Sequence, residues 1–233
     1  MLKTLRNAFK IKDIRNKLLF TFAMLIVVRI GGLLPIPGVD TEYFSSLLSN
    51  LGDLSFLDAF TGGSFEQMSI FALSITPYIT SSIIIQLLTI AIPKLEEMQK
   101  EGEDGRKKIT EITRYVTVAL ALIESIAMAI GFGHQGLIKD YKSMSGIHYF
   151  AAIVVVVATL TAGSAFLMWV GERITEKGVG NGISIVLLIN IVSTLPSDFA
   201  TLYEQFISGQ KIAFGVLSAA IILALVVILI AFV

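Results

Sequence analysis

Two stretches of this chain reach the length of a membrane-spanning helix without a single charged residue. They cover residues 149–170 and 212–233. The hydrocarbon core of a bilayer is about 30 Å thick and is crossed by about 20 helical residues. Charged residues make up only 15% of the chain, against about 25% in a typical soluble domain. The sequence therefore predicts an all-α polytopic membrane protein.

Four further apolar stretches complete the predicted set of six spans. In chain order the spans are residues 18–34, 70–92, 115–132, 149–170, 182–195 and 212–233. The fifth is short, and by length alone it is also compatible with a re-entrant or buried helix. Pro77 lies near the outer end of the second span. Because proline removes a backbone donor, we expect a bend or break there.

Lysine and arginine are unevenly distributed between the connecting segments, and this sets the predicted orientation. Residues 1–17 are basic, whereas residues 31–70 contain no lysine or arginine. The basic residues expected in two cytoplasmic loops are Arg106, Lys107, Lys108, Arg173 and Lys177. We expect a cytoplasmic N-terminus, no cleavable signal peptide and an external loop at residues 196–211. The sixth span stops without a charged flank, as if the chain continued beyond it.

Residues 56–70 are too polar to span a membrane and too apolar for an ordinary loop. They contain Gly62 and Gly63 between apolar stretches. Such a segment folds back into the membrane only where protein or a water-filled cavity shields its backbone. The alternative is an external amphipathic helix that lies on the bilayer surface. The residues alone favour the two readings equally.

Two features of the spans are candidates for function. Ile75, Ile79 and Ile83 recur every four residues and share one helical face. Such a stripe is more often packing, and the alternative is a hydrophobic constriction that gates by excluding water. Glu124 lies in the middle of the third span. A carboxylate inside a membrane is a candidate proton relay or polar contact, unless it simply faces water or a partner helix.

The sequence gives no case for an enzyme, a metal site or a cofactor. The chain has no cysteine, and its two histidines, His134 and His148, are too isolated to provide a set of metal ligands. It contains no Ser–His–Asp set, no HExxH motif and no Walker motif. The glycine-rich stretch Gly178-Val179-Gly180-Asn181-Gly182 follows no predicted strand, so it indicates a tight turn and not a nucleotide site.

Several blocks of sequence together resemble the SecY family of protein-translocation channels. They include Pro35-Ile36-Pro37-Gly38, Ser69-Ile70-Phe71-Ala72-Leu73, Pro77-Tyr78-Ile79, Gly105-Arg106-Lys107-Lys108, Phe166-Leu167-Met168-Trp169 and the glycine-rich stretch at 178–182. The blocks occur in order, with compatible spacing, from about Arg15 to Leu195. The resemblance implies the first five-span half of a clamshell-shaped channel, plus a sixth span, in the bacterial cytoplasmic membrane.

The resemblance also implies roles for particular residues. A ring around the pore would include Ile75, Ile79, Ile183 and Leu187, where Leu187 replaces the isoleucine common in the family. A plug, expected as a short helix at about residues 56–70, would include Phe56, Phe60, Gly62, Gly63, Phe65 and Met68. A lateral gate would include Pro77, Thr80, Ile84, Gln86 and Glu124.

By the same resemblance the chain would be the pore-forming subunit of a translocon. It would move unfolded secretory polypeptides across the membrane and release signal anchors sideways into membrane lipid. Implied partners are SecE-like and SecG-like subunits, a SecA-like motor, the ribosome, signal sequences, nascent chains and the C-terminal half of the same channel. Two alternatives are half of a secondary transporter with a substrate site at the midplane, and a structural subunit whose apolar stripes serve packing only.

Overall fold

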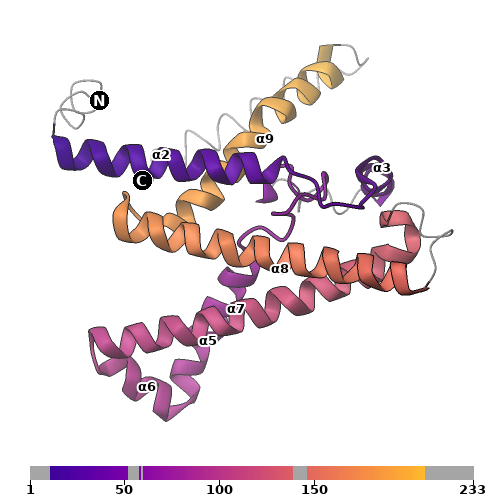
Figure 1. Ribbon diagram of the computed structural model, residues 1–233. Coiled ribbons are helices and arrows are strands. Elements are labelled where there is room, and N and C mark those ends of the chain that lie inside the picture. The colour runs from indigo at the N-terminus through magenta and orange to yellow at the C-terminus, as the bar shows by residue number, and fades with distance from the viewer. Residues whose placement is uncertain (1–10, 52–57, 59, 139–145, 208–233) are drawn as a thin grey trace. The chain divides into compact units, whose positions relative to one another are not determined.

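The computed structural model describes residues 11–51, 58, 60–138 and 146–207. Figure 1 shows these residues as helices joined by turns and short irregular segments. The helices are α2 (Lys12–Gly32), α3 (Thr41–Leu51), α5 (Thr76–Ala91), α6 (Pro93–Lys100), α7 (Glu103–Phe132), the π-helical turn η1 (Gly133–Leu137), α8 (Gly146–Lys177) and α9 (Gly182–Ile207). The predicted all-α class is confirmed.

The chain divides into two compact units, Met1–Ile191 and Val192–Val233. In the first unit α7 packs along α8, α5 packs on α7, and α2 lies against α8 (Figure 1). Its apolar core has two parts. One gathers around α3, the end of α7 and the first half of α8, and the other around α2, the second half of α8 and the start of α9. In the second unit, the described residues are the last part of α9.

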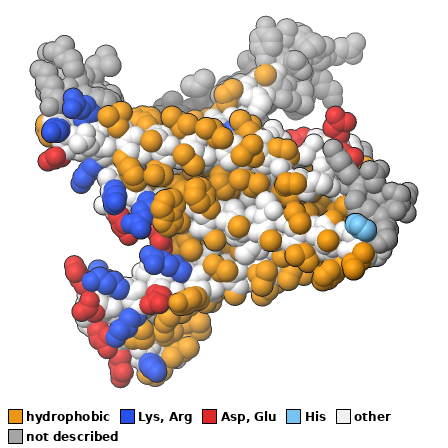
Figure 2. Space-filling view, viewed as in Figure 1, with side chains coloured by type: hydrophobic (Ala, Val, Ile, Leu, Met, Phe, Trp, Pro, Cys, Tyr) orange, Lys and Arg blue, Asp and Glu red, His pale blue; other side chains and the backbone are white. Residues whose placement is uncertain are grey.

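Membrane character is visible in both the helices and the surface. The helices α7 and α8 are long and apolar enough to cross a membrane, and the bent pair α5–α6 adds a third span if counted as one. Helix α2 is not counted among these spans because it carries the charged residues Arg15, Lys17 and Arg29. Helix α9 is not counted because its apolar part is shorter than a membrane span. In Figure 2 hydrophobic side chains run along the long helices, and most charges gather at the end that carries α6.

The second predicted span is wrong at its outer end. Helix α5 begins at Thr76, and residues 62–75 form turns, which we call the turn segment. Pro77 therefore lies in the first turn of α5, where no backbone donor is required, and it starts the helix instead of bending it. The sharp bend occurs at Ile92 and Pro93, where α5 and α6 meet at 102°.

The end of α9 also differs from expectation. Residues 196–207, expected in an external loop, continue α9 as far as Ile207, with Pro196 inside the helix. Hydropathy indicates which residues favour lipid, whereas a helix continues wherever its backbone hydrogen bonds are made. The end of the predicted span and the end of the helix therefore need not coincide. Most of the basic segment at 1–17 and the whole sixth span at 212–233 lie outside the described residues.

The turn segment is held between α2 and α8 by close approaches that require glycine. Backbone bonds join Ile36 N to Met68 O at 3.0 Å and Ile70 N to Leu34 O at 2.9 Å. On the other side, a Cβ atom added to Gly163 of α8 would lie only 1.8 Å from the carbonyl oxygen of Ile70. The absence of a side chain at Gly163 is therefore what lets the turn segment lie directly on α8.

Candidate functional site

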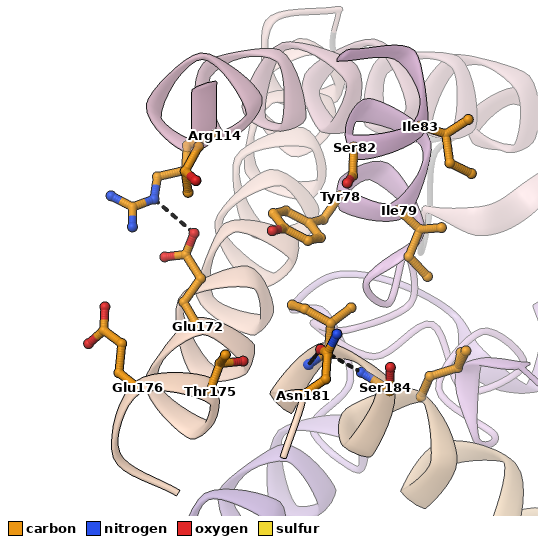
Figure 3. Close-up of a pocket in the computed structure, with 13 residues that line it drawn as sticks. Tyr78, Ile79, Ser82, Ile83, Arg114, Glu172, Thr175, Glu176, Asn181 and Ser184 are labelled. Carbon is orange, nitrogen blue, oxygen red and sulfur yellow. Dashed lines mark hydrogen bonds and ion pairs between the residues drawn. The ribbon is translucent and has the colours of Figure 1, made fainter. Parts of the chain in front are cut away.

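A large open cavity lies in the first unit between α5, α7, α8 and the start of α9. Its volume is about 550 Å³, and Figure 3 shows the residues around it. The lining residues are Tyr78, Ile79, Ser82 and Ile83 of α5, Thr110 and Arg114 of α7, Glu172, Thr175 and Glu176 of α8, and Asn181, Ile183, Ser184 and Leu187 at the start of α9. The cavity has a polar side and an apolar side.

The polar side is built around an ion pair between two helices. The Nε atom of Arg114 donates to Oε1 of Glu172 at 2.8 Å, with the carboxylate much less exposed than the guanidinium. Across the cavity, Asn181 Oδ1 accepts hydrogen bonds from Ile183 N at 3.1 Å and Ser184 N at 3.4 Å (Figure 3). A side-chain oxygen in this position caps the start of α9. These contacts fix where α7, α8 and α9 meet.

The apolar side brings together three of the four predicted ring residues. Ile79 of α5 and Ile183 and Leu187 of α9 all line the cavity. Ile75 does not, because it precedes α5 and is completely buried, with 0% exposure, against Val170 and Val186. Ile79 packs against the same core cluster as Ile75, and Ile79 N donates to the Ile75 carbonyl oxygen at 3.1 Å, so Ile75 differs from the rest of the stripe in its burial and not in its spacing. The other two members of that stripe do share the cavity.

The predicted plug residues lie in and beside the turn segment. Phe65 and Met68 are buried in the apolar core near α3, while Phe60 is half exposed. Gly62 and Gly63 have φ values of 70° and 83°. Backbone in this left-handed region cannot continue an α-helix, so the expected short helix is wrong over residues 62–70, which form turns. Phe56 lies outside the described residues.

Two polar contacts anchor the beginning of this region. Arg29 of α2 donates from Nη1 to the carbonyl oxygen of Gly62 at 3.0 Å. Asp58 accepts a hydrogen bond from Glu66 N at 2.9 Å through Oδ1. Burial raises the pKa of the Asp58 carboxyl, and the hydrogen bond from Glu66 N opposes that rise without cancelling it. Arg29 is thus a contact between α2 and the turn segment.

The predicted gate residues are divided between two packed helices. Thr80, Ile84 and Gln86 lie exposed on α5, and Pro77 is buried at its start. Ser81 of α5 and Thr117 of α7 share a hydrogen bond of 2.5 Å, which holds the two helices together. Glu124 of α7 is half-buried, and within the described part of the chain no ion pair or hydrogen bond joins its side chain to another residue.

The predicted cytoplasmic residues lie at the end of the molecule where charges gather. Lys107 pairs with Asp104 and Lys108 with Glu101, each at 3.4 Å. Arg106 and Lys107 also line a second cavity of about 600 Å³ beside Arg114. Arg173 pairs with Glu176 at 2.7 Å and lies over the ring of Trp169. Lys177 ends α8, where a positive charge complements the helix dipole.

Sequence reasoning missed the polar half of the cavity. Tyr78, Arg114, Glu172 and Asn181 were not among the predicted site residues, although all four line it. A usable signal was present for two of them. Arg114 and Glu172 carry opposite charges at the start of the third predicted span and just after the end of the fourth, and these two ends face the same side of the membrane in the predicted orientation.

Comparisons with known proteins agree with this architecture. The sequence profile of the SecY family matches residues 69–233. The protein translocase subunit SecY of Bacillus subtilis is 44% identical over 214 residues, which are 90% of this chain and 48% of that protein. Its counterpart in Staphylococcus carnosus is 46% identical over 215 residues, 91% of this chain and 48% of that protein. The chain therefore spans about half the length of these relatives.

Two solved structures have a similar fold. They are a protein-conducting channel and Sec61 in a canine ribosome-channel complex from the endoplasmic reticulum. Each has a TM-score of 0.50 and 18% identity, and the match covers 89% of this chain and 41% of the other. These two matches show the fold, and the match of the SecY family profile to residues 69–233 shows that the chain belongs to the SecY family.

Proposed function

We propose that this chain forms the first half of the pore-forming subunit of a Sec translocon in the bacterial cytoplasmic membrane. In this role it moves unfolded secretory polypeptides across the membrane and releases signal anchors sideways into lipid. The observation that carries the proposal is the convergence of Ile79, Ile183 and Leu187, from α5 and α9, on one open cavity. The names of its relatives, protein translocase subunits, support the same role.

The aliphatic side of the cavity acts as part of a seal. Side chains of isoleucine and leucine offer no hydrogen bonds to water, so a narrow ring of them resists the passage of ions. They also adapt their shape to a passing polypeptide. We assign Ile79, Ile183 and Leu187 to this ring. Ile75 is buried in the core and supports the start of α5 from there. Later spans of the complete channel supply the remaining members.

The region from residue 58 to 70 closes the channel from outside in the resting state. Its support is the enclosed position of Phe65 and Met68, together with the absence of lysine and arginine from residues 31–70. A signal sequence is an apolar helix and leaves water by entering between α5, α7 and the other half of the channel. Binding there favours the open state and displaces the plug. The exposed face of α5, with Thr80, Ile84 and Gln86, then forms one side of the lateral gate.

The partners follow from the same role. We propose SecE-like and SecG-like subunits, a SecA-like motor, the ribosome and the second half of the channel. The N-terminus and the basic loops with Arg106, Lys108 and Lys177 face the cytoplasm. This orientation is supported by the gathering of charges at one end of the molecule (Figure 2).

The test is photo-crosslinking to a secretory chain stalled during export, with the probe at Ile79 or Ile183. The matched control is a probe at Ile90, which lies on the same helix as Ile79 but is 82% exposed outside the cavity. We expect the first two positions to crosslink to residues well past the signal sequence, and Ile90 to give no such product. Equal crosslinking at all three, or none from Ile79 and Ile183 while substrate is engaged, would contradict the proposal.

A further inference from the structure

Ser74 is a non-glycine residue held in a conformation that side chains disfavour. Its φ is 53°, in the left-handed region, and its side chain is 2% exposed. It stands at the junction between the turn segment and α5, directly before Ile75. Strain of this kind persists where surrounding contacts impose it, and such positions gather where a protein changes conformation. The contacts around Ser74 are therefore informative.

Two other helices hold Ser74 by hydrogen bonds. Ser164 Oγ of α8 donates to the carbonyl oxygen of Ser74 at 3.2 Å. Asn190 Nδ2 of α9 donates to Ser74 Oγ, also at 3.2 Å. All three residues are buried. In a water-poor interior, an unmade hydrogen bond is costly, so these contacts define the position of Ser74. We call Ser74, Ser164 and Asn190 the serine latch.

The serine latch connects the two walls of the cavity that carry aliphatic side chains, the α5 wall with Ile79 and Ile83 and the α9 wall with Ile183 and Leu187. Asn190 follows Ile183 by seven residues and Leu187 by three, so all three lie on one face of α9. Ile183 and Leu187 line the cavity. On the opposite wall, Ser74 is separated from the lining residues Tyr78 and Ile79 by a single turn of chain. A displacement of Ser74 therefore moves the beginning of the α5 wall relative to α9.

We propose that the serine latch is a positioning device that holds the turn segment and the two aliphatic walls in the closed arrangement. The proposal rests on the function proposed above. Release of the bond between Asn190 and Ser74 frees Ser74 to leave the left-handed region. The relief of that strain offsets part of the lost hydrogen bond, so the closed and open positions differ little in free energy. Such a balance allows the modest binding energy of an engaged substrate to shift the population.

The first test compares variants of the latch by their resting ion conductance in planar bilayers, using the assembled translocon that contains this chain. Asn190→Leu keeps the branched outline of the side chain, with somewhat larger methyl groups, and removes the donor. Ser74→Ala removes the acceptor and keeps a Cβ atom in the left-handed conformation, so the strain that favours release is unchanged. We expect each to raise the resting conductance about three- to tenfold, the effect of losing one buried hydrogen bond on a two-state equilibrium.

A double variant and a control separate a latch from general loosening. Ser74→Ala combined with Asn190→Leu removes the same bond twice, so its conductance should equal that of the stronger single variant. The control is Ser125→Ala, which deletes a hydrogen bond of 3.0 Å between Ser125 and Thr161 that joins α7 and α8 away from the cavity. We expect the control to leave the resting conductance unchanged.

The outcomes distinguish this inference from the proposed function. If Ser74→Ala assembles, crosslinks to the stalled chain from Ile79 as the unmodified protein does and conducts no more ions at rest, the latch is wrong and the channel role stands. Additive effects in the double variant, or an equal increase in Ser125→Ala, would also overturn the latch. If the unmodified chain gives no crosslinks from Ile79 and Ile183, the proposed function itself fails.

Discussion

The turn segment and α5 follow one another in the chain, yet their surroundings are opposite. Met68, Ser69 and Ile75 of the turn segment are fully enclosed by other helices. By contrast α5 exposes a row of large apolar side chains, including Ile83, Leu87 and Ile90. An α-helix bonds its own backbone and can face lipid or an open cavity, whereas irregular backbone at membrane depth needs protein around it. These opposite surroundings are the ones that the proposed plug and the proposed gate helix require.

The largest expected effect comes from the same polar substitution made once in the turn segment and once in α5. Ile75→Asn places an amide in the packed core and should lower the free energy of unfolding by about 3–5 kcal/mol. Ile79→Asn places the same amide at the cavity, where Ile79 is only partly buried, so it should lower stability less than Ile75→Asn and raise the ion leak. Thermal unfolding in detergent and conductance in bilayers measure the two effects. Loss of stability without leak in both variants would favour a purely structural subunit.

This contrast also shows what the sequence could reveal. The isoleucine stripe pointed to Ile79 because helical spacing decides which residues share a face, whereas Ile183 and Leu187 were predicted from the family resemblance alone. The sequence did not reveal that Ile75 is buried, because its neighbours in the core, Val170 and Val186, are distant in the sequence. The helix start at Thr76 depends on the left-handed Ser74 and on contacts with α8 and α9, which are distant in the sequence.

The plug region illustrates a second limit of the sequence. Its mixed polarity predicted a segment shielded by protein or lying on the membrane surface, and the structure has the shielded form. The choice was set by long-range contacts, such as the bond from Arg29 to Gly62 and the close approach of Ile70 to Gly163. Neither contact leaves a periodic pattern in the sequence. The two glycines did mark the place where the helix could not continue.

A pair of glycine substitutions sharpens the comparison with a smaller effect. Gly163→Ala puts a methyl group into the carbonyl of Ile70 and should destabilise the protein by about 1–3 kcal/mol, the usual range for overpacking. Gly131→Ala on α7 meets no atom within 4 Å and should stabilise its helix by up to about 1 kcal/mol. Denaturation of both variants in the same detergent gives the comparison. Equal destabilisation would refute the idea that the turn segment rests directly on α8.

The ion pair at the polar side of the cavity should matter less to stability. Arg114→Gln removes the contact with Glu172, but exposed pairs of this kind contribute about 0–1 kcal/mol. We expect a shift of that size in thermal unfolding, smaller still in high salt because ions screen the pair. The salt dependence of the difference from the unmodified chain is the measurement. A loss of stability above about 2 kcal/mol would contradict this expectation, because only a buried ion pair costs that much to break.

The smallest effect concerns pH and the plug region. Burial raises the pKa of Asp58 above its unfolded value. A group of this kind contributes its full stability below the unfolded pKa, near pH 4, and loses it as the pH rises through the folded pKa. Asp58→Asn should therefore flatten the decline of stability above pH 4. Thermal unfolding of both proteins between pH 4 and pH 7 tests this, and a steeper decline in the variant would contradict it.

The most direct test of the central claim uses two neighbouring residues of α9. Leu187 lines the cavity, whereas Leu188 is 59% exposed and is not among its lining residues. Because the chain has no cysteine of its own, a single cysteine at either position can form a disulfide with one cysteine in a polypeptide arrested during export. We expect efficient disulfide formation at position 187 and little at position 188. Equal bonding at both, or bonding only at 188, would contradict the assignment of this cavity to the path of the polypeptide.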